Sequence, residues 1–250
     1  MIGAGDLQGH WRRAWLKAPG LLDHDTCVHW MQCGALYADV RIPSGRPDLR
    51  GASALADLSP ATLVTLLAAE GFAGEITVKS DVCTWARRIN WHGATDVVDV
   101  GALSLESDGA LIETGVQAEY SELWHRLDDH PSEGLRLRGS GGETGYLVTV
   151  GDRFVFGLGD PSAPPTADVI TALRAGTRPE GIDQVFARAH VLGRWRTSRA
   201  GVALKATNPL LEGEVVLTRD ARGLTWEGVD FHGQPHVVRL EPVLTVEVAA

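Results

Sequence analysis

The fold of this chain can be worked out from residues 27–42, which read Cys27-Val-His-Trp-Met-Gln-Cys33, Gly34, Ala35-Leu-Tyr-Ala-Asp-Val-Arg-Ile42. Two strand-like runs flank a single glycine, and this pattern predicts an antiparallel β-hairpin. A short helix is predicted next, at residues 60–70, because Pro60 suits a first helical turn and Gly71 suits a helix end. Only strand-like runs follow, separated by turns too short for a parallel crossover. The first half of the chain is therefore expected to form an antiparallel meander.

The second half repeats this order of elements. Tyr146-Leu-Val-Thr-Val150 and Arg153-Phe-Val-Phe156 flank the turn Gly151-Asp152, and a helix is predicted at residues 167–175. Strand-like runs then continue to Val248. A meander that occurs twice, with short turns throughout, predicts an all-β chain of two tandem antiparallel β-barrels, each with one short helix.

A polar, turn-rich segment at residues 128–134 is the best candidate for a boundary, and it predicts domains at 1–130 and 131–250. Residues 8–26 show no clear period and are expected to be an entry segment. The remaining strands are expected at 72–79, 82–91, 96–105, 110–116 and 119–126, and then at 184–191, 194–199, 201–206, 213–219, 224–231 and 236–248.

Composition excludes several classes of function. The formal net charge is −9, and no block of Lys and Arg is present, so nucleic acid is not an expected partner. The longest apolar run, residues 61–69, is far shorter than the ~20 residues that cross a bilayer, and no membrane partner is expected. Three cysteines without C-x-x-C spacing argue against a disulfide framework. Together with a start that lacks signal-peptide features, they predict a cytoplasmic protein.

No motif for a metal ion, a cofactor or a nucleophile is evident. Nine histidines are present, but Gly233 and Pro235 separate His232 from His236, so these two cannot lie one turn apart on a helix. Neither G-x-S-x-G nor a strand–G-x-G-x-x-G–helix unit occurs. We therefore expect neither a metal site nor a cofactor.

Aromatic and charged residues share faces of three predicted strands, because side chains alternate along an extended chain. A barrel lined in this way would offer aromatic walls to an apolar ligand and charged groups to its polar end. The candidate ligand-binding residues are Tyr37, Arg41, Trp85, Arg87, Tyr120, Trp124 and Arg126. The alternative is that these rows face solvent. For the row of Tyr37 and Arg41 this alternative is favoured, because the opposite face is a convincing apolar inner surface, formed by Leu36, Ala38, Val40 and Ile42.

Glu113 and Glu122 are the candidate catalytic residues. Glu113 lies in the otherwise apolar stretch Leu111-Ile-Glu-Thr-Gly115, and Glu122 shares its strand face with Trp124. A carboxyl group in such surroundings can have a raised pKa and act as a general acid or base. Glu113 is equally compatible with a buried hydrogen-bonding role or an outward-facing position.

Gly9-His-Trp11 and Gly193-Arg-Trp195 share the G-x-W form that opens the first strand of lipocalins, where an Arg from a late strand stacks on the Trp. With the repeated plan, the chain resembles a small family of tandem lipocalin-like barrels that includes a fungal kinase-interacting protein and uncharacterised bacterial relatives. The resemblance is carried mainly by the first half, in Gly9-His-Trp-Arg12, Val28-His-Trp-Met-Gln32, Tyr37-Ala-Asp-Val-Arg-Ile-Pro43, Glu70-Gly-Phe-Ala-Gly74, Thr84-Trp-Ala-Arg87, Leu111-Ile-Glu-Thr-Gly115 and Tyr120-Ser-Glu-Leu-Trp124. It implies the fold and an expectation of ligand binding, without a catalytic residue set.

Three hypotheses of function follow. The first is a protein that binds a small, partly apolar ligand, with an acidic molecule as one candidate, in the first barrel. The second is a cofactor-independent acid/base enzyme (an isomerase, cyclase or lyase) in that same barrel, and the third is an interaction scaffold without a cavity. The second barrel carries fewer clustered ionisable groups and is expected to be structural or to form a homodimer.

Overall fold

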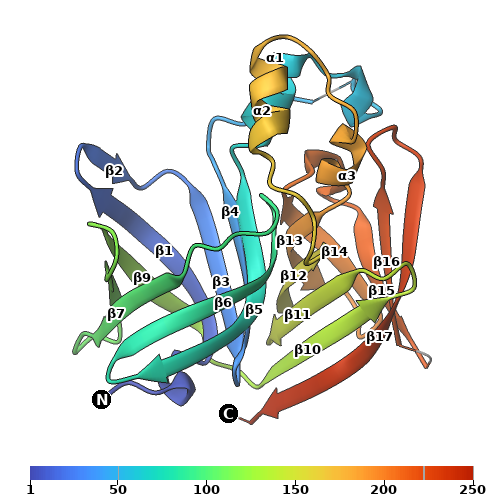
Figure 1. The fold of residues 1–250 in the computed structure, drawn as a ribbon. Helices are drawn as coiled ribbons and strands as arrows, with labels where there is room; N and C mark the ends of the chain where they lie inside the picture. The colour runs from blue at the N-terminus through green and yellow to red at the C-terminus, as the bar shows by residue number, and fades with distance from the viewer. Residues whose placement is uncertain (50, 222, 250) are drawn as a thin grey trace.

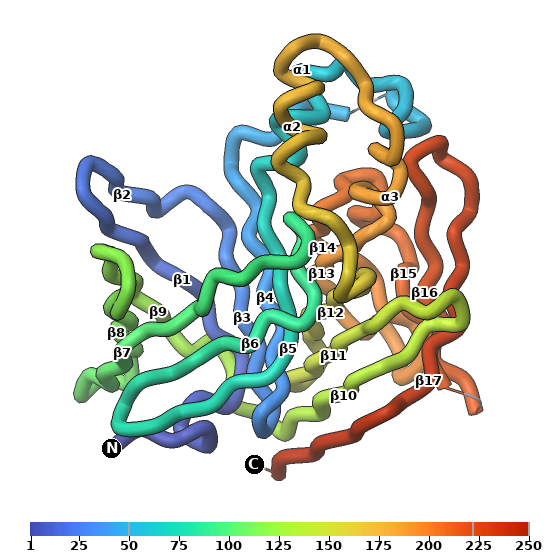
Figure 2. Tube along the Cα trace, viewed as in Figure 1, coloured from blue at the N-terminus to red at the C-terminus, as the bar shows by residue number. Residues whose placement is uncertain are grey.

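The computed structural model describes residues 1–49, 51–221 and 223–249, and Figure 1 shows two antiparallel β-barrels side by side under a cap of short helices. The tube in Figure 2 follows the chain from the blue first barrel to the red end of the second, with both termini at the end opposite the cap. The expected all-β class with two tandem antiparallel barrels is confirmed.

The first barrel closes because its last strand pairs with its first. Its eight strands are β1 (Gly9–Ala18), β3 (Cys27–Cys33), β4 (Leu36–Ile42), β5 (Glu70–Lys79), β6 (Val82–Asn90), β7 (Asp99–Leu105), β8 (Leu111–Gly115) and β9 (Ser121–Asp128), with β9 antiparallel to β1. A short strand, β2 (Leu21–Asp23), extends β1 as a hairpin. The expectation of an entry segment at residues 8–26 was wrong. Two register shifts in the β1–β9 pairing, one of them between Arg13 and Trp15, break the period-2 pattern there.

The second barrel is closed as well, and apolar side chains fill it. Its strands are β10 (Ser132–Gly139), β11 (Thr144–Val150), β12 (Arg153–Gly159), β13 (Ala189–Trp195), β14 (Ala200–Ala206), β15 (Val215–Asp220), β16 (Gly223–Val229) and β17 (Pro235–Val248). Phe156 and Trp226 stack inside it with ring centroids 5.2 Å apart, among buried leucine, valine and alanine side chains.

Three α-helices form the cap, α1 (Pro60–Leu66), α2 (Ala167–Arg174) and α3 (Ile182–Phe186). The 3-10 turns at Leu55–Asp57 and Pro209–Leu211 pack with the cap, and a third, at Ala4–Leu7, lies next to the N-terminus. The second half therefore has two short helices where one was expected, and the strand expected from residue 184 begins at Ala189. The apolar spacing of Ile182, Val185 and Phe186 is helical, and all three side chains are buried in the cap.

The apolar face of β4 packs against the second barrel. Leu36, Ala38, Val40 and Ile42 share one hydrophobic cluster with residues of β11, β12 and β13, namely Tyr146, Val148, Val150, Val155 and Leu192. This face was expected to line the first barrel, and that expectation was wrong because a neighbouring barrel can bury an apolar strand face as fully as a barrel interior does. Tyr37 and Asp39 are consequently buried on the other side of β4.

In the described part of the chain, no helix combines the length and the apolar character that crossing a bilayer requires. Within those same residues, no group of three or more His, Cys, Asp or Glu side chains converges as a metal site would require.

Candidate functional site

The interior of the first barrel holds a network of charged side chains. Arg13 of β1 donates from Nη1 to Oε1 of Glu122 on β9 at 2.6 Å, and it also pairs with Asp23 of β2. Arg41 of β4 donates from Nε to Oδ1 of Asp39 at 3.0 Å, and its Nη1 lies 3.6 Å from Glu122. Burial raises the pKa of Asp39 to about 6, against the opposing effect of Arg41. These charges are tolerated in the barrel because each has a partner of opposite sign.

Glu113 of β8 faces Glu122 across the strand pair, so two carboxyl groups lie in the same interior. Burial raises the pKa of Glu113 to about 8, and the negative charge of Glu122 contributes to the rise. The hydroxyl of Tyr120 donates to Oε1 of Glu113 at 2.7 Å. Gly101 leaves the space that Glu113 occupies, since a Cβ there would lie 2.8 Å from Cγ of Glu113. Glu113 is thus mainly protonated at neutral pH.

Aromatic rings surround these charges and leave little free volume. Trp30 contacts Trp85 and Trp124 edge-on, with ring centroids 6.0 and 5.7 Å apart. The cavity that remains has a volume of about 10 Å³, which is room for about one water molecule. It is lined by Trp30, Tyr37, Asp39, Arg41, Phe72, Trp85, Asp99, Glu113 and Trp124. The barrel interior by itself therefore does not accommodate a drug-sized ligand.

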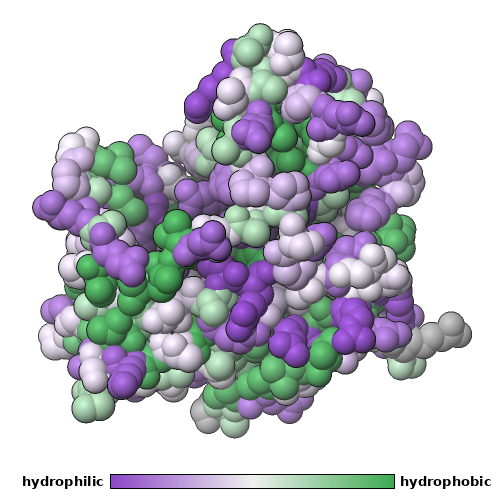
Figure 3. All heavy atoms as spheres, in the orientation of Figure 1, coloured by the Kyte–Doolittle hydropathy of each residue, from purple (hydrophilic) through white to green (hydrophobic). Residues whose placement is uncertain are grey.

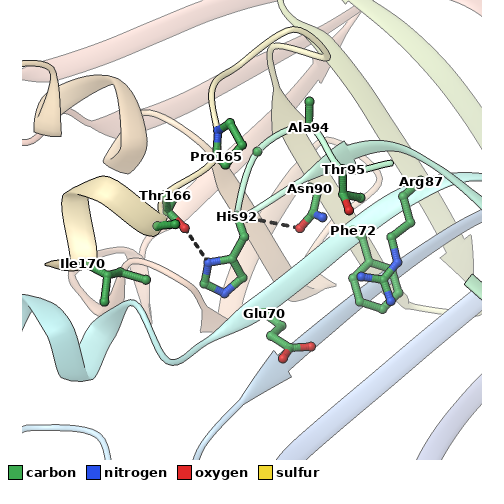
Figure 4. A pocket seen from close by; sticks show the side chains of 12 residues that line it. Glu70, Phe72, Arg87, Asn90, His92, Ala94, Thr95, Pro165, Thr166 and Ile170 are labelled. Carbon is green, nitrogen blue, oxygen red and sulfur yellow. Dashed lines mark hydrogen bonds between the residues drawn. The ribbon is translucent and has the colours of Figure 1, made fainter. Parts of the chain in front are cut away.

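A larger pocket of about 350 Å³ opens at the mouth of the first barrel, where β5 begins and β6 ends; we call it the mouth pocket. Figure 4 shows the side chains that line it, with Glu70 and Arg87 on the barrel side and Thr166 and Ile170 on the side of α2. Its lining comes from both halves of the chain: Glu70, Phe72, Arg87, Asn90, His92, Gly93, Ala94, Thr95, Pro165, Thr166, Ala167 and Ile170.

Phe72 separates the mouth pocket from the inner cavity and lines both. The guanidinium of Arg87 lies 3.6 Å from the centroid of the Phe72 ring, and that of Arg41 lies 4.8 Å from it. Arg87 donates from Nε and Nη2 to Oδ2 of Asp99 at 2.9 and 2.7 Å, and Asp99 also lines the inner cavity. Two cation–π contacts and one ion pair thus hold this aromatic partition.

A histidine joins the two halves of the chain at the pocket wall (Figure 4). Nε2 of His92 lies 3.0 Å from the carbonyl oxygen of Ala69, and Nδ1 lies 2.8 Å from the hydroxyl of Thr166. Because a carbonyl only accepts, Nε2 carries the hydrogen, and Nδ1 accepts from Thr166. Burial lowers the pKa of His92, which agrees with a neutral ring. Thr166 precedes α2, so this contact ties the second half to the mouth of the first barrel.

Arg188 of the second half fixes the same wall. It is 3% exposed and donates from Nη1 to the carbonyl oxygen of Trp91 at 2.9 Å and from Nη2 to that of Pro164 at 2.8 Å. Trp91 follows β6, and Pro164 precedes the pocket residue Pro165. Arg188 thereby holds two loops that carry the pocket lining.

The structure brings most of the sequence-predicted residues together. Tyr37, Arg41, Trp85, Trp124 and Glu113 line the inner cavity, Arg87 lines the mouth pocket, and Glu122 and Tyr120 hydrogen-bond to residues of the network. Sequence reasoning missed Phe72, Asn90, His92 and Thr166. The mouth pocket forms between the two halves, and no local pattern in either half signals it.

Arg126 does not join this group, and its assignment to the barrel interior was wrong. It is exposed, with its guanidinium 4.5 Å from the centroid of the Trp11 ring, and it donates from Nη2 to the carbonyl oxygen of Asp6. Arg126 lies close to the end of β9, beside the 3-10 turn at Ala4–Leu7, where its side chain reaches solvent, whereas Glu122 and Trp124 are buried. Arg126 makes the Arg–Trp contact that the resemblance implied for Gly9-His-Trp11.

Comparison with known proteins finds a structural relative. No protein-family model matches the sequence, and no curated protein matches it significantly. The fold is similar to the crystal structure of the uncharacterised protein YLR301w of Saccharomyces cerevisiae, which also has two eight-stranded antiparallel barrels. The TM-score is 0.55 and the sequence identity 10%, over 96% of this chain and 99% of that chain. The likeness is one of fold.

Proposed function

We propose that this chain is a small-molecule-binding protein that holds its ligand in the mouth pocket, with the ligand's polar end directed at the charged interior of the first barrel. The observation that carries this proposal is the wall that the two spaces share. Phe72 forms the wall of a pocket of about 350 Å³ and also the wall of the charged inner cavity. The pocket volume lies within the usual range for ligand sites, roughly 300–1,000 Å³.

The lining suits a ligand that is partly apolar. Phe72, Pro165 and Ile170 supply apolar surface, while Glu70 and Arg87 supply charge. Next to the pocket, the segment that leads into β7 carries Val97 and Val98, which are 75% and 53% exposed. Figure 3 shows hydrophobic residues gathered over the β7 side of the first barrel. An apolar ligand would meet this surface as it approaches the pocket.

Binding of an uncharged fluorescent probe, N-phenyl-1-naphthylamine, tests this proposal. Ile170→Trp places a larger side chain in the mouth pocket, and probe affinity should fall at least tenfold. Val237→Trp is the matched control, since Val237 is 62% exposed on the second barrel and should leave affinity unchanged. Equal affinity of the wild type and Ile170→Trp would contradict the assignment of the pocket.

Acid–base catalysis is the second candidate function, and the position of Glu113 favours it. A carboxyl group with a pKa of about 8 lines the cavity beside Glu122, and such a group can donate or accept a proton near neutral pH. An isomerase, cyclase or lyase would need this property. Carbon-13 NMR of the glutamate side-chain carboxyl groups provides the test, because a Glu113 that titrates near its ordinary value of 4.5 removes the basis for this candidate.

A further inference from the structure

Two residues that line the inner cavity bear buried hydrogen-bond donors that have no partner among the described residues of the chain. They are the hydroxyl of Tyr37, which is fully buried, and the indole N–H of Trp124, whose side chain is 1% exposed. Buried polar groups in folded proteins are nearly always hydrogen-bonded, because an unmade bond costs free energy. Because both side chains line one cavity, a single acceptor from outside the chain is the simplest partner for the two donors.

The chemistry of these side chains restricts that group to an acceptor. An indole N–H can only donate, and burial holds the pKa of Tyr37 well above its usual value, so the phenol keeps its proton. Glu113 lines the same cavity and is mainly protonated at neutral pH, which adds a third donor. An amine or other donor at this position would leave all three hydrogens without an acceptor.

The surrounding charges disfavour an anion. Each guanidinium group near the cavity already faces a carboxylate, in the pairs Arg13–Glu122, Arg41–Asp39 and Arg87–Asp99. A ligand carboxylate would lie close to these acidic groups, or it would have to displace one of them from its arginine. A buried charge without a partner is costly, so the acceptor should be uncharged.

The volume of the cavity limits the part of the ligand inside it to one heavy atom. A volume of about 10 Å³ accommodates a single heavy atom such as a carbonyl oxygen, whereas a carboxylate or phosphate presents several oxygens. A carbonyl oxygen has two lone pairs and can accept from two donors together.

We propose that the inner cavity holds the carbonyl oxygen of an uncharged ligand, such as a ketone or an amide, which accepts hydrogen bonds from Tyr37 and Trp124. This inference rests on the proposed function, because the remainder of the ligand then lies in the mouth pocket, and the Phe72 ring between the two spaces has to turn aside to admit it. The arginine-containing strands suggested an acidic ligand, and the inference is that the ligand is uncharged.

Three small probes of similar shape and different charge test the inference: acetamide, acetate and acetamidinium. The reporter is the indole N–H resonance of Trp124 in a ¹H–¹⁵N spectrum, assigned by its loss in Trp124→Phe. Acetamide should shift this resonance saturably, with an affinity at least tenfold above that of the two charged probes. Tyr37→Phe should weaken acetamide binding roughly tenfold, the effect of one hydrogen bond. Tyr146→Phe is the matched control, because Tyr146 is also buried but donates to Glu75 at 2.7 Å.

Two results would overturn the inference. Tighter binding of acetate or acetamidinium would show that the cavity selects for charge. If no probe moves the Trp124 resonance, the two donors hold a bound water only. In that case N-phenyl-1-naphthylamine would still bind in the mouth pocket, and the proposed function would stand. If the wild type does not bind N-phenyl-1-naphthylamine, the proposed function itself is refuted.

Discussion

Replacing Glu113 by Gln should change how the stability of the protein depends on pH. The amide has the shape of a protonated carboxyl group and can still accept a hydrogen bond from Tyr120, but it does not ionise. Glu113 has a pKa of about 8 in the folded chain and about 4.5 when unfolded. Between these values the folded state binds more protons than the unfolded state, so the wild type loses stability as pH rises.

The size of the effect follows from these two pKa values. One pKa unit corresponds to 1.36 kcal/mol, so at pH 7 the wild type has lost about 3 kcal/mol relative to pH 4.5 through this group. Above pH 8 the loss levels off at about 5 kcal/mol. Glu113→Gln avoids this loss. The variant should match the wild type near pH 4.5 and exceed it progressively up to pH 8.

Urea unfolding of both proteins at pH 4.5, 7 and 8.5 measures this difference, since the two chains differ only at residue 113. Glu75→Gln is the matched control. Glu75 also accepts a tyrosine hydroxyl but is ion-paired with Arg88, and its replacement should give no gain in stability with rising pH. A difference between wild type and Glu113→Gln that stays constant with pH would refute the reasoning.

Two further predictions concern groups outside the pocket. Arg126→Ala removes an exposed cation–π contact to Trp11, so urea unfolding should show that the free energy of unfolding falls by about 0.5–1 kcal/mol. Probe binding in the mouth pocket should stay unchanged. A loss of probe binding would show that Arg126 belongs to the site. Nε2 of His10 and Nδ1 of His29 lie 2.8 Å apart, and burial lowers their pKa values to about 4 and about 3. Through these two groups the unfolded chain binds more protons below pH 6.5, so the pair lowers the stability of the wild type between pH 6.5 and 4. In urea unfolding the wild type should lose stability relative to His29→Gln over that range, and a difference between the two proteins that stays constant with pH would exclude the pair as the cause.

The sequence predicted the fold class because closed meanders depend on local signals. Strand alternation, short turns and the position of Pro60 act within a few residues, and the structure agrees with them. Gly71 was expected to end the helix of residues 60–70, and this was wrong, because α1 ends at Leu66 and Gly71 lies in β5. β1 was not predicted because its register shifts interrupt the alternation of buried and exposed side chains. α3 escaped prediction because five residues are too few to separate a helical period from a strand.

The candidate site was predictable only in part. Side-chain alternation placed Glu122 and Trp124 on one face, and both are buried in the first barrel. Alternation cannot tell which face of a strand a second barrel covers, and for this reason the apolar face of β4 was assigned to the wrong side. The mouth pocket needs His92 from one half and Thr166 from the other, and neither half shows that they meet.

A crystal structure of the chain with bound N-phenyl-1-naphthylamine tests the central claim most directly. We expect the naphthyl group in the mouth pocket, in contact with Phe72 and Ile170. Three other pockets are alternatives: one of about 270 Å³ beside Arg188 and His236, one of about 430 Å³ beside Lys17 and Tyr120, and one of about 550 Å³ beside Arg136 and Tyr146. Density for the probe only in one of these, or only on the exposed surface near Val97, would contradict the proposed function.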